Sequence, residues 1–344
     1  MDRWSNDSFS DPKIGKIIWR DIKERCEYRI HPLFGWRPLP NQKLETLQIN
    51  SRGLRSRELN EQDNRPRCVI LGGSVAWGFG SSSNSKTFAY LLENELANTY
   101  GVEIAVINLS DQVYSSVEEI KSFIFSVETY NPSYVVSLSG HNDISRGFRG
   151  HKFKQFGHEQ LTFLNWGIES GLINGLSASS ILRGIFIRVS EKLTSIAENK
   201  RDYLSQTSFD TSDKENIPLE LLKLKMNVIN DYCSARDISV VHVLQPYLHF
   251  KLNKSEYEAR LAENNGKEKT EYFVAKYALF RESYQKLVDA YDSESIQQVD
   301  ATRWFDGTDE SIFIDPVHFS DRGYEIFTKK FAKYFVSHML MKDI

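Results

Sequence analysis

Short apolar runs alternate with stretches of helical periodicity along most of the chain. Four runs rich in β-branched and aliphatic residues recur at Cys68–Leu71, Ile104–Ile107, Tyr134–Val136 and Ile238–Val243. Such runs are typical of strands that are buried on both faces of a parallel sheet. A fifth strand is predicted near Gln298–Asp300, which follows the fourth run after a long helical pattern.

The segments between and after these runs carry apolar residues three and four positions apart, which is the spacing of one helix face. These stripes predict five helices, over Phe88–Leu96, Val117–Val127, Leu222–Cys233, Phe273–Tyr284 and Tyr324–Tyr334. Alternating strands and helices imply right-handed crossovers between parallel strands. We therefore expect an α/β fold in three layers, with helices on both faces of a central parallel sheet.

Two parts of the chain interrupt this alternation. Residues 1–66 lack sustained periodicity, and we expect an N-terminal extension that packs on the core. Within it, 14–22 predicts a short helix and 31–41 reads as extended, proline-punctuated chain. The stretch at about 145–218 is too long for a simple connection and predicts a helical and loop insertion. One domain over 67–344, split by this insertion, explains the length better than two independent units.

Composition and charge exclude several classes of protein. The 344 residues include 43 basic and 46 acidic side chains, a net charge of −3, so no nucleic-acid partner is expected. Three cysteines are too few for a disulfide scaffold, and no cluster has metal-ligand spacing, so we expect neither a metal nor a cofactor. No apolar run spans a bilayer and no signal peptide is visible, which favours a cytoplasmic location. The charged segment 251–269 is interpreted as a solvated helix or excursion.

The first predicted strand leads directly into Gly72, Gly73 and Ser74. Glycines there permit a sharp turn, which would expose Ser74 at the carboxyl edge of the sheet, where open α/β sheets bind ligands. A serine at this place can act as a nucleophile if a base reaches it. Two other interpretations stay open: a helix cap on a tight turn, and a phosphate-binding loop, although the lysine of a Walker sequence is absent.

The candidate base lies near the end of the chain, where Asp315 precedes His318 by three residues. Pro316 and the helix-capping residue Ser320 place both on a loop. A carboxylate at this spacing can accept the Nδ1–H of the imidazole and leave Nε2 to face the serine. The alternative is that His318 is an ordinary surface or capping histidine.

A third group of polar residues follows the Tyr134–Val136 strand at the same edge of the sheet. The side-chain amide of Asn142 can donate a hydrogen bond to a developing oxyanion, while turn formation is the alternative explanation for its presence. We interpret His141 as a residue that lines the site. Gln245, at the end of the fourth strand, and Gly73 are further substrate-binding candidates.

Four short motifs occur in a characteristic order, each at the end of a predicted strand or before the last helix: Gly72–Ser74, Asn108–Leu109, Gly140–Asp143 and Asp315–His318. Together they resemble the SGNH (GDSL-like) hydrolases. The resemblance implies a flavodoxin-like three-layer fold with Ser74 as nucleophile, His318 as general base and Asp315 as the residue that orients it. Asn142 and the backbone N–H of Ser74 would form part of the oxyanion hole.

The sequence departs from this family after the second strand. The family motif Asn-x-Gly-x-x-Gly, counted from Asn108, here has Ser110 and Val113 in place of its glycines. The backbone N–H of Val113 is the candidate third oxyanion donor, but a β-branched residue resists the positive φ that glycine tolerates. A slow enzyme and a non-catalytic binding module therefore both stay open.

The predicted activity is that of a serine esterase that removes O-acetyl or other short O-acyl groups from a carbohydrate. The substrate class comes from 31–38 and 49–55, which resemble the lead-in of SGNH proteins found with surface-polysaccharide biosynthesis enzymes. We expect a small-molecule or oligosaccharide ester as the partner. A sugar O-acyltransferase with the same triad, a lipase- or thioesterase-like hydrolase and a binding module are the alternatives.

Overall fold

The predicted strands form one parallel sheet in the computed structural model, which describes residues 12–31, 34–60, 62–112, 114–148, 217–291 and 293–340. Its strands are β3 (Arg67–Gly72), β4 (Ala105–Asn108), β5 (Tyr134–Ser139), β6 (Ser239–Leu244) and β7 (Ile296–Asp300). They pair in the order β4-β3-β5-β6-β7, and every pairing is parallel. This order, with the first strand of the core next to the switch point, is that of the flavodoxin-like sheets. The predicted fold class is confirmed.

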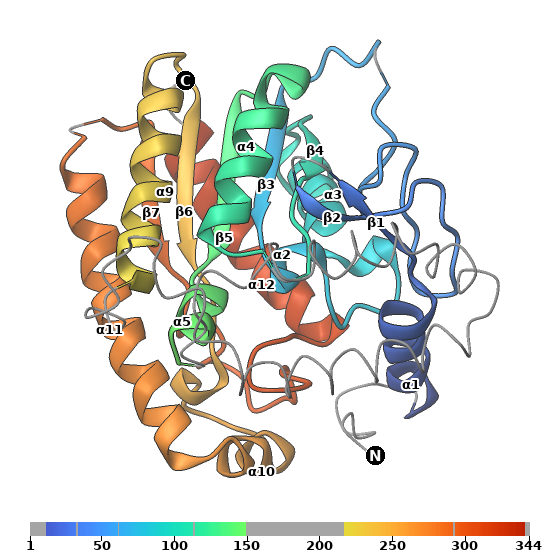
Figure 1. The fold of residues 1–344 in the computed structure, drawn as a ribbon, viewed down its shortest axis with the longest axis vertical. Helices are drawn as coiled ribbons and strands as arrows, with labels where there is room; N and C mark the ends of the chain where they lie inside the picture. The colour runs from blue at the N-terminus through green and yellow to red at the C-terminus, as the bar shows by residue number, and fades with distance from the viewer. Residues whose placement is uncertain are drawn as a thin grey trace, which may run out of the picture. The chain divides into compact units, whose positions relative to one another are not determined.

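Helices cover both faces of the sheet (Figure 1). The helices are α3 (Phe88–Tyr100) and α12 (Asp321–Phe335) on one face, α4 (Ser116–Tyr130) and α9 (Ile217–Ser234) on the other, and α11 (Lys267–Asp289) against β7 and α9. Within β3, Cys68 and Ile70 join the core under α3 and α12, whereas Val69 and Leu71 join the core under α4 and α9. Burial on both faces is the reason for the continuous apolar runs in the sequence.

Local sequence signals set the ends of these helices. Gly101 adopts φ 67° at the C-terminus of α3, a left-handed conformation that glycine adopts at little cost. The carboxylate of Glu118 accepts the backbone N–H of Ser115, at 2.9 Å, in a capping box ahead of α4. Ser320 caps α12 through the N–H of Gly323. Glycine and capping residues in the sequence therefore set where these three helices begin or end.

The segment before β3 combines a helix with a β-hairpin. Helix α1 (Pro12–Arg20) continues into a π-helical turn, η2 (Asp21–Arg25), which agrees with the short helix expected there. Strands β1 (Tyr28–His31) and β2 (Gly35–Pro38) pair antiparallel. The extended chain predicted over 31–41 is confirmed in β2, whereas the pairing of this strand with the residues that precede it was not predicted.

Apolar residues of this N-terminal segment reach the core next to the nucleophile candidate. Ile18 and Ile22 are buried in one cluster with Trp77, Phe79 and Ile314. Trp77 and Phe79 follow Ser74 closely, and Ile314 precedes Asp315. The segment therefore packs against the two stretches of chain that carry the candidate serine and the candidate base.

The remaining short elements lie at the sheet edge and around it: α2 (Ser74–Trp77), η3 (Asn84–Lys86), α5 (His141–Phe148), η5 (Leu248–Phe250), α10 (Glu256–Asn264) and η6 (Val336–Leu340). The prediction that 251–269 is solvated is wrong for two of its charged residues. Lys251 and Glu258 are buried as an ion pair, because their mutual attraction and hydrogen bonds to backbone groups of 310–313 replace the water that both charges lose. Of the insertion expected at about 145–218, residues 149–216 lie outside the described residues.

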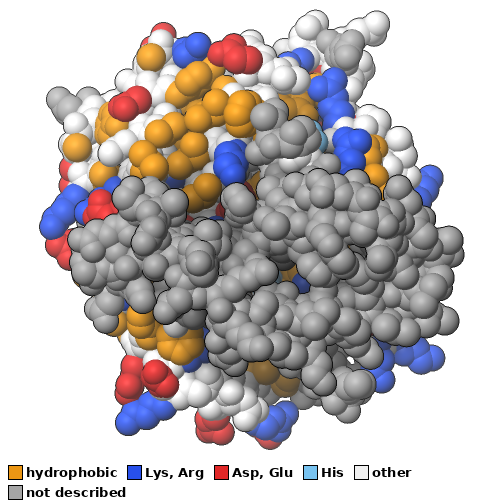
Figure 2. Space-filling view, in the orientation of Figure 1, with side chains coloured by type: hydrophobic (Ala, Val, Ile, Leu, Met, Phe, Trp, Pro, Cys, Tyr) orange, Lys and Arg blue, Asp and Glu red, His pale blue; other side chains and the backbone are white. Residues whose placement is uncertain are grey.

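Some apolar side chains of α4 and α9 point away from the sheet and remain exposed. They include Ile124 and Phe125 on α4 and Leu224 on α9, and Figure 2 shows hydrophobic side chains gathered on this side of the protein. Exposed apolar residues are common on folded proteins, so we assign this face no function. None of the described helices combines the length and apolar character that crossing a bilayer requires.

Candidate active site

Ser74 stands directly beyond the C-terminal end of β3, as the first residue of α2. Gly72 makes the turn possible: its φ is 148°, and a Cβ at this position would lie 2.3 Å from the carbonyl oxygen of Leu138. Any other residue would collide with the neighbouring strand. The first N–H groups of a helix have no intrahelical acceptor, and the N–H of Ser74 is one of them in α2. Ser74 itself is half-buried.

The structure brings Ser74, His318 and Asp315 together. His318 Nε2 lies 2.7 Å from Ser74 Oγ, and His318 Nδ1 lies 2.7 Å from Asp315 Oδ2. The other carboxylate oxygen, Asp315 Oδ1, accepts the backbone N–H groups of Val317 at 2.8 Å and His318 at 2.9 Å. Asp315 is therefore held by its own loop while it orients the imidazole, in the hydrogen-bond order of a serine–histidine–aspartate triad.

The surroundings of the Asp315 carboxylate favour its ionised form. Burial raises the pKa of this carboxyl, but the charge of His318 and the hydrogen bonds from His318 and Val317 outweigh burial, so the pKa falls below its ordinary value of 3.8. A permanent negative charge at Nδ1 fixes the tautomer that presents an unprotonated Nε2 to a hydroxyl. The same charge would stabilise a protonated His318 ring.

An aromatic ring restricts the imidazole further. Phe79 lies 4.3 Å from His318 between ring centroids, tilted by 37°. The backbone N–H of Phe79 donates to the carbonyl of Ser74, at 2.9 Å. One residue thus links the turn that carries the serine to the ring that would activate it, a contact that the sequence analysis missed because Phe79 belongs to no recognised motif.

Asn142 lies against the backbone immediately before Ser74. Its side-chain Nδ2 donates to the carbonyl oxygen of Tyr114 at 2.7 Å, and a Cβ on Gly73 would lie only 2.3 Å from the same nitrogen. Because an amide nitrogen carries two hydrogens, a second donor is left beside Ser74. Gly73 is therefore needed for close approach, and not for a left-handed conformation.

The remaining sequence-predicted residues lie in different surroundings. His141 is buried, with ring centroids 4.8 Å from Phe273 and 5.5 Å from Tyr247. Gln245 is buried at the end of β6, and its backbone N–H donates to the carbonyl of Ser139, at 3.1 Å. Their role in lining the site stays a prediction. Val113 lies outside the described residues.

The loop after β4 is braced by the N-terminal segment. Gln112 Nε2 donates to the Tyr28 hydroxyl at 2.6 Å, and that hydroxyl lies 3.4 Å from Asp111 Oδ1. Burial raises the pKa of Asp111 to about 6, although hydrogen bonds from Gln112 and Tyr28 and the charge of Arg37 oppose the shift. Sequence reasoning had no signal for this bracing, because 83 residues separate Tyr28 from Asp111.

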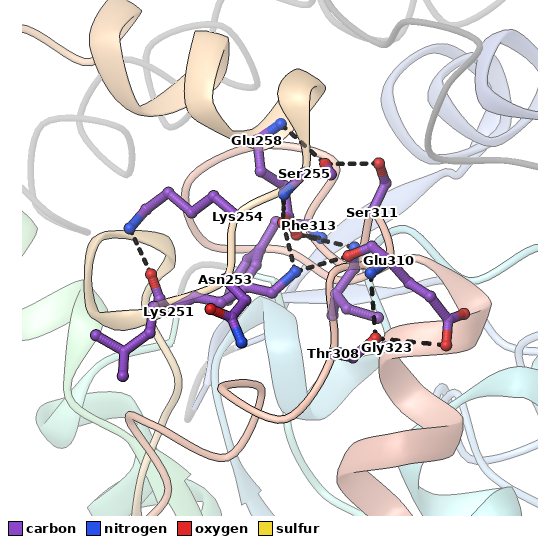
Figure 3. Close-up of polar contacts among 12 residues, drawn as sticks. Lys251, Asn253, Lys254, Ser255, Glu258, Thr308, Glu310, Ser311, Phe313 and Gly323 are labelled. Carbon is purple, nitrogen blue, oxygen red and sulfur yellow. Dashed lines mark hydrogen bonds and ion pairs between the residues drawn. The ribbon is translucent and has the colours of Figure 1, made fainter.

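A buried carboxylate holds the loop that precedes Asp315 (Figure 3). Glu258 Oε1 accepts the backbone N–H groups of Ile312 at 2.9 Å and Phe313 at 3.0 Å. Its other oxygen pairs with Lys251 Nζ at 2.5 Å, and Lys251 also donates to the carbonyl of Glu310 at 2.6 Å. The base loop is therefore anchored to α10 and to the segment before it.

The turn after Ser74 has supports of its own. The Tyr324 hydroxyl lies 3.0 Å from the carbonyl oxygens of both Val75 and Phe79. Arg55 is buried and donates to the carbonyl of Gly78 at 2.7 Å. Burial lowers the pKa of Arg55 to about 10, so the guanidinium stays charged at neutral pH. These contacts come from α12 and from the N-terminal segment, far from Ser74 in sequence.

In the part of the chain that the structure describes, no group of three or more histidine, cysteine, aspartate or glutamate side chains is arranged to hold a metal ion. What the site does contain is an alcohol, an imidazole and a carboxylate in series, with amide donors beside the alcohol. This arrangement is chemically suited to nucleophilic attack on a carbonyl carbon.

The fold and this arrangement define an α/β protein with a serine–histidine–aspartate series at the carboxyl edge of its sheet. No protein-family model matches the sequence, and no curated protein matches it either. Solved structures that match include an α/β hydrolase enzyme, LAE5, from the metagenome of Lake Arreo, with a TM-score of 0.45, 11% identity and coverage of 79% of this chain and 94% of that one.

Two further matches are enzymes of named activity. A lipase/acylhydrolase from Enterococcus faecalis matches with a TM-score of 0.43 and 16% identity, over 79% of this chain and 96% of its own. A catalytic mutant of an acetylxylan esterase from Geobacillus stearothermophilus matches with a TM-score of 0.42 and 11% identity, over 78% of this chain and 93% of its own.

Proposed function

We propose that the protein is a serine esterase with Ser74 as its nucleophile. The observation that carries the proposal is the continuous series Ser74 Oγ–His318–Asp315, with both connecting distances at 2.7 Å. His318 Nε2 takes the hydroxyl proton as Ser74 Oγ attacks the ester carbonyl carbon. The tetrahedral intermediate then expels the alcohol, which leaves with the proton that His318 returns to it.

Water completes the reaction. His318 removes a proton from a water molecule, whose oxygen attacks the acyl-enzyme carbonyl; the ester bond to Ser74 breaks and Oγ regains a proton from His318. One ester and one water thus give one alcohol and one carboxylic acid, with the enzyme unchanged. The second N–H of Asn142 and the backbone N–H of Ser74 are the donors that would stabilise each oxyanion. The backbone N–H of Val113 stays a predicted third donor.

The substrate that we propose is an O-acetyl or other short O-acyl ester of a carbohydrate. Its support is the resemblance of 31–38 and 49–55 to the lead-in of SGNH proteins found with surface-polysaccharide biosynthesis enzymes. The packing of the N-terminal segment against residues on either side of the triad agrees with a part for that segment in the site.

The test is covalent labelling with a fluorophosphonate together with turnover of a short aryl acetate. We expect the wild type to be labelled and active, Ser74→Ala to be unlabelled, and both Ser74→Ala and His318→Ala to lose about 10⁴-fold or more in kcat. Ser133→Ala, an exposed serine before β5, is the matched control and keeps both properties.

A folded wild type that shows neither label nor turnover refutes the esterase. Turnover that survives in Ser74→Ala refutes the choice of nucleophile. A sugar acceptor that gains the acetyl group while acetate release falls would make the protein an acyltransferase, because the acceptor hydroxyl then replaces water in the second half of the reaction.

A further inference from the structure

Lys23 belongs to the π-helical turn η2, which is fixed on both sides of this residue. The carboxylate of Asp21 is buried and accepts the backbone N–H of Thr46 at 2.8 Å and its hydroxyl at 3.0 Å. On the other side of Lys23, Cys26 is buried and its N–H donates to the carbonyl of Asp21, at 2.7 Å. Hydrogen bonds therefore hold the backbone on both sides of Lys23, and its side chain is exposed along part of its length while its ammonium is partly covered.

The Lys23 ammonium reaches two parts of the candidate site. Its Nζ lies 5.1 Å from the centroid of the Phe79 ring, and Phe79 packs on His318. The same Nζ lies 3.4 Å from Gln112 Oε1, in the loop after β4 that precedes Val113. A cation from the N-terminal segment thus lies near both the ring that packs on His318 and the loop after β4.

Lys23 differs in its partners from three other lysines of this protein. Lys86, Lys225 and Lys251 each pair with a glutamate within 3.3 Å, whereas Lys23 forms no ion pair within 4.0 Å with any residue that the structure describes. Burial lowers the pKa of Lys23, and the attraction of the Asp315 carboxylate offsets only part of that effect. A partly desolvated cation with a long, neutral contact is a favourable place for an anion.

We propose that Lys23 binds an anionic group of the substrate, and that the substrate is an O-acyl ester of an acidic sugar such as a uronic acid. The proposal rests on the esterase activity proposed above and narrows its substrate class. A carboxylate is the group that fits, because the ammonium offers three donors and, among the described residues, only Gln112 Oε1 accepts from it, at a long 3.4 Å. Lys23 is then a specificity-determining residue supplied by the segment that precedes the sheet.

The test uses a matched pair of ligands, O-acetylated methyl glucoside and O-acetylated methyl glucuronide, which differ only in a CH₂OH or a carboxylate. Their binding to Ser74→Ala, which is expected to leave the ester intact, is measured by calorimetry. We expect the glucuronide to bind about 5- to 10-fold more tightly, and this preference to shrink as ionic strength rises. Adding Lys23→Met removes the preference, and Lys23→Arg keeps most of it.

Lys333→Met is the control variant, because Lys333 is exposed near the end of α12, about 18 Å along the helix from its start. It should leave the preference unchanged. Equal binding of the two ligands, or a preference that survives Lys23→Met, overturns the proposal. A loss of affinity for both ligands in Lys23→Met would also overturn it, since that result indicates a structural role.

Turnover separates this inference from the proposed function. In enzyme with Ser74 intact, Lys23→Met should raise KM for the glucuronide about 5- to 10-fold and leave kcat unchanged, as expected for an interaction present in both ground state and transition state. If the glucuronide binds Ser74→Ala more tightly but wild type releases no acetate, the esterase fails while the anion site of Lys23 stands. If acetate is released at equal kcat/KM from both sugars, the esterase stands and the Lys23 proposal fails.

Discussion

Replacing Glu258 by glutamine is expected to destabilise the protein by about 3–5 kcal/mol, although only one charge is removed. The reason is the environment of its partner: the Lys251 and Glu258 side chains are 1% and 0% exposed, and their charged atoms lie 2.5 Å apart. In Glu258→Gln the ammonium keeps the carbonyl of Glu310 but loses its counter-ion. An uncompensated buried charge costs far more than a surface pair gains.

The reverse change should be milder. In Lys251→Met the Glu258 carboxylate still accepts three backbone N–H groups, those of Ser255, Ile312 and Phe313, all within 3.0 Å. Hydrogen bonds of this kind to a charged group contribute about 1.5–3 kcal/mol each. Because all three remain in the variant, we expect the free energy of unfolding to fall by only about 1–3 kcal/mol. The double variant has no buried charge, and it should be about 1–3 kcal/mol more stable than Glu258→Gln alone.

The assay is urea unfolding followed by tryptophan fluorescence. The free energies of unfolding are compared between variants whose m values, the dependence of that free energy on urea concentration, are equal. Lys86→Met is the control, because Lys86 pairs with Glu325 at a similar 2.7 Å but with side chains 41% and 32% exposed; it should cost about 1 kcal/mol or less. The reasoning is refuted if Glu258→Gln costs no more than the control. It is also refuted if the double variant loses the sum of the two single losses.

Three further predictions concern the immediate surroundings of the site. Gly73→Ala should lower kcat about 100-fold with little change in KM, because its Cβ would displace the Asn142 amide, 2.3 Å away. Burial raises the pKa of Asp111 from 3.8 to about 6, so the folded protein holds this proton more tightly than the unfolded chain does. The free energy of unfolding should therefore fall by about 3 kcal/mol as pH rises from about 4 to 6. In Asp111→Asn, urea unfolding should show a smaller change of stability over this pH range. Tyr324→Phe should cost about 1–3 kcal/mol in the same assay, because the hydroxyl serves two buried carbonyls; no measurable loss would contradict this.

Local patterns predicted most of the sheet and its covering helices. The five strands and the five long helices each carry their own periodicity, because burial on two faces or on one stripe requires it. The two-strand hairpin of the N-terminal segment was missed, since proline and polar residues interrupt its alternation. Lys251 and Glu258 looked solvated for a similar reason: their charges find partners in the loop ahead of Asp315, more than fifty residues later.

The sequence by itself determined the places where chemistry is possible. Glycines after a buried strand, an asparagine after the third strand and an aspartate three residues before a histidine are local features, and local sterics and hydrogen bonding decide what they can do. Only the tertiary structure decided which of them meet. The 2.7 Å contact between His318 and Ser74 spans 244 residues of chain, and Lys23 comes to the same site from a third segment. Such contacts depend on how α12 and the N-terminal segment pack against the sheet, which no local pattern encodes.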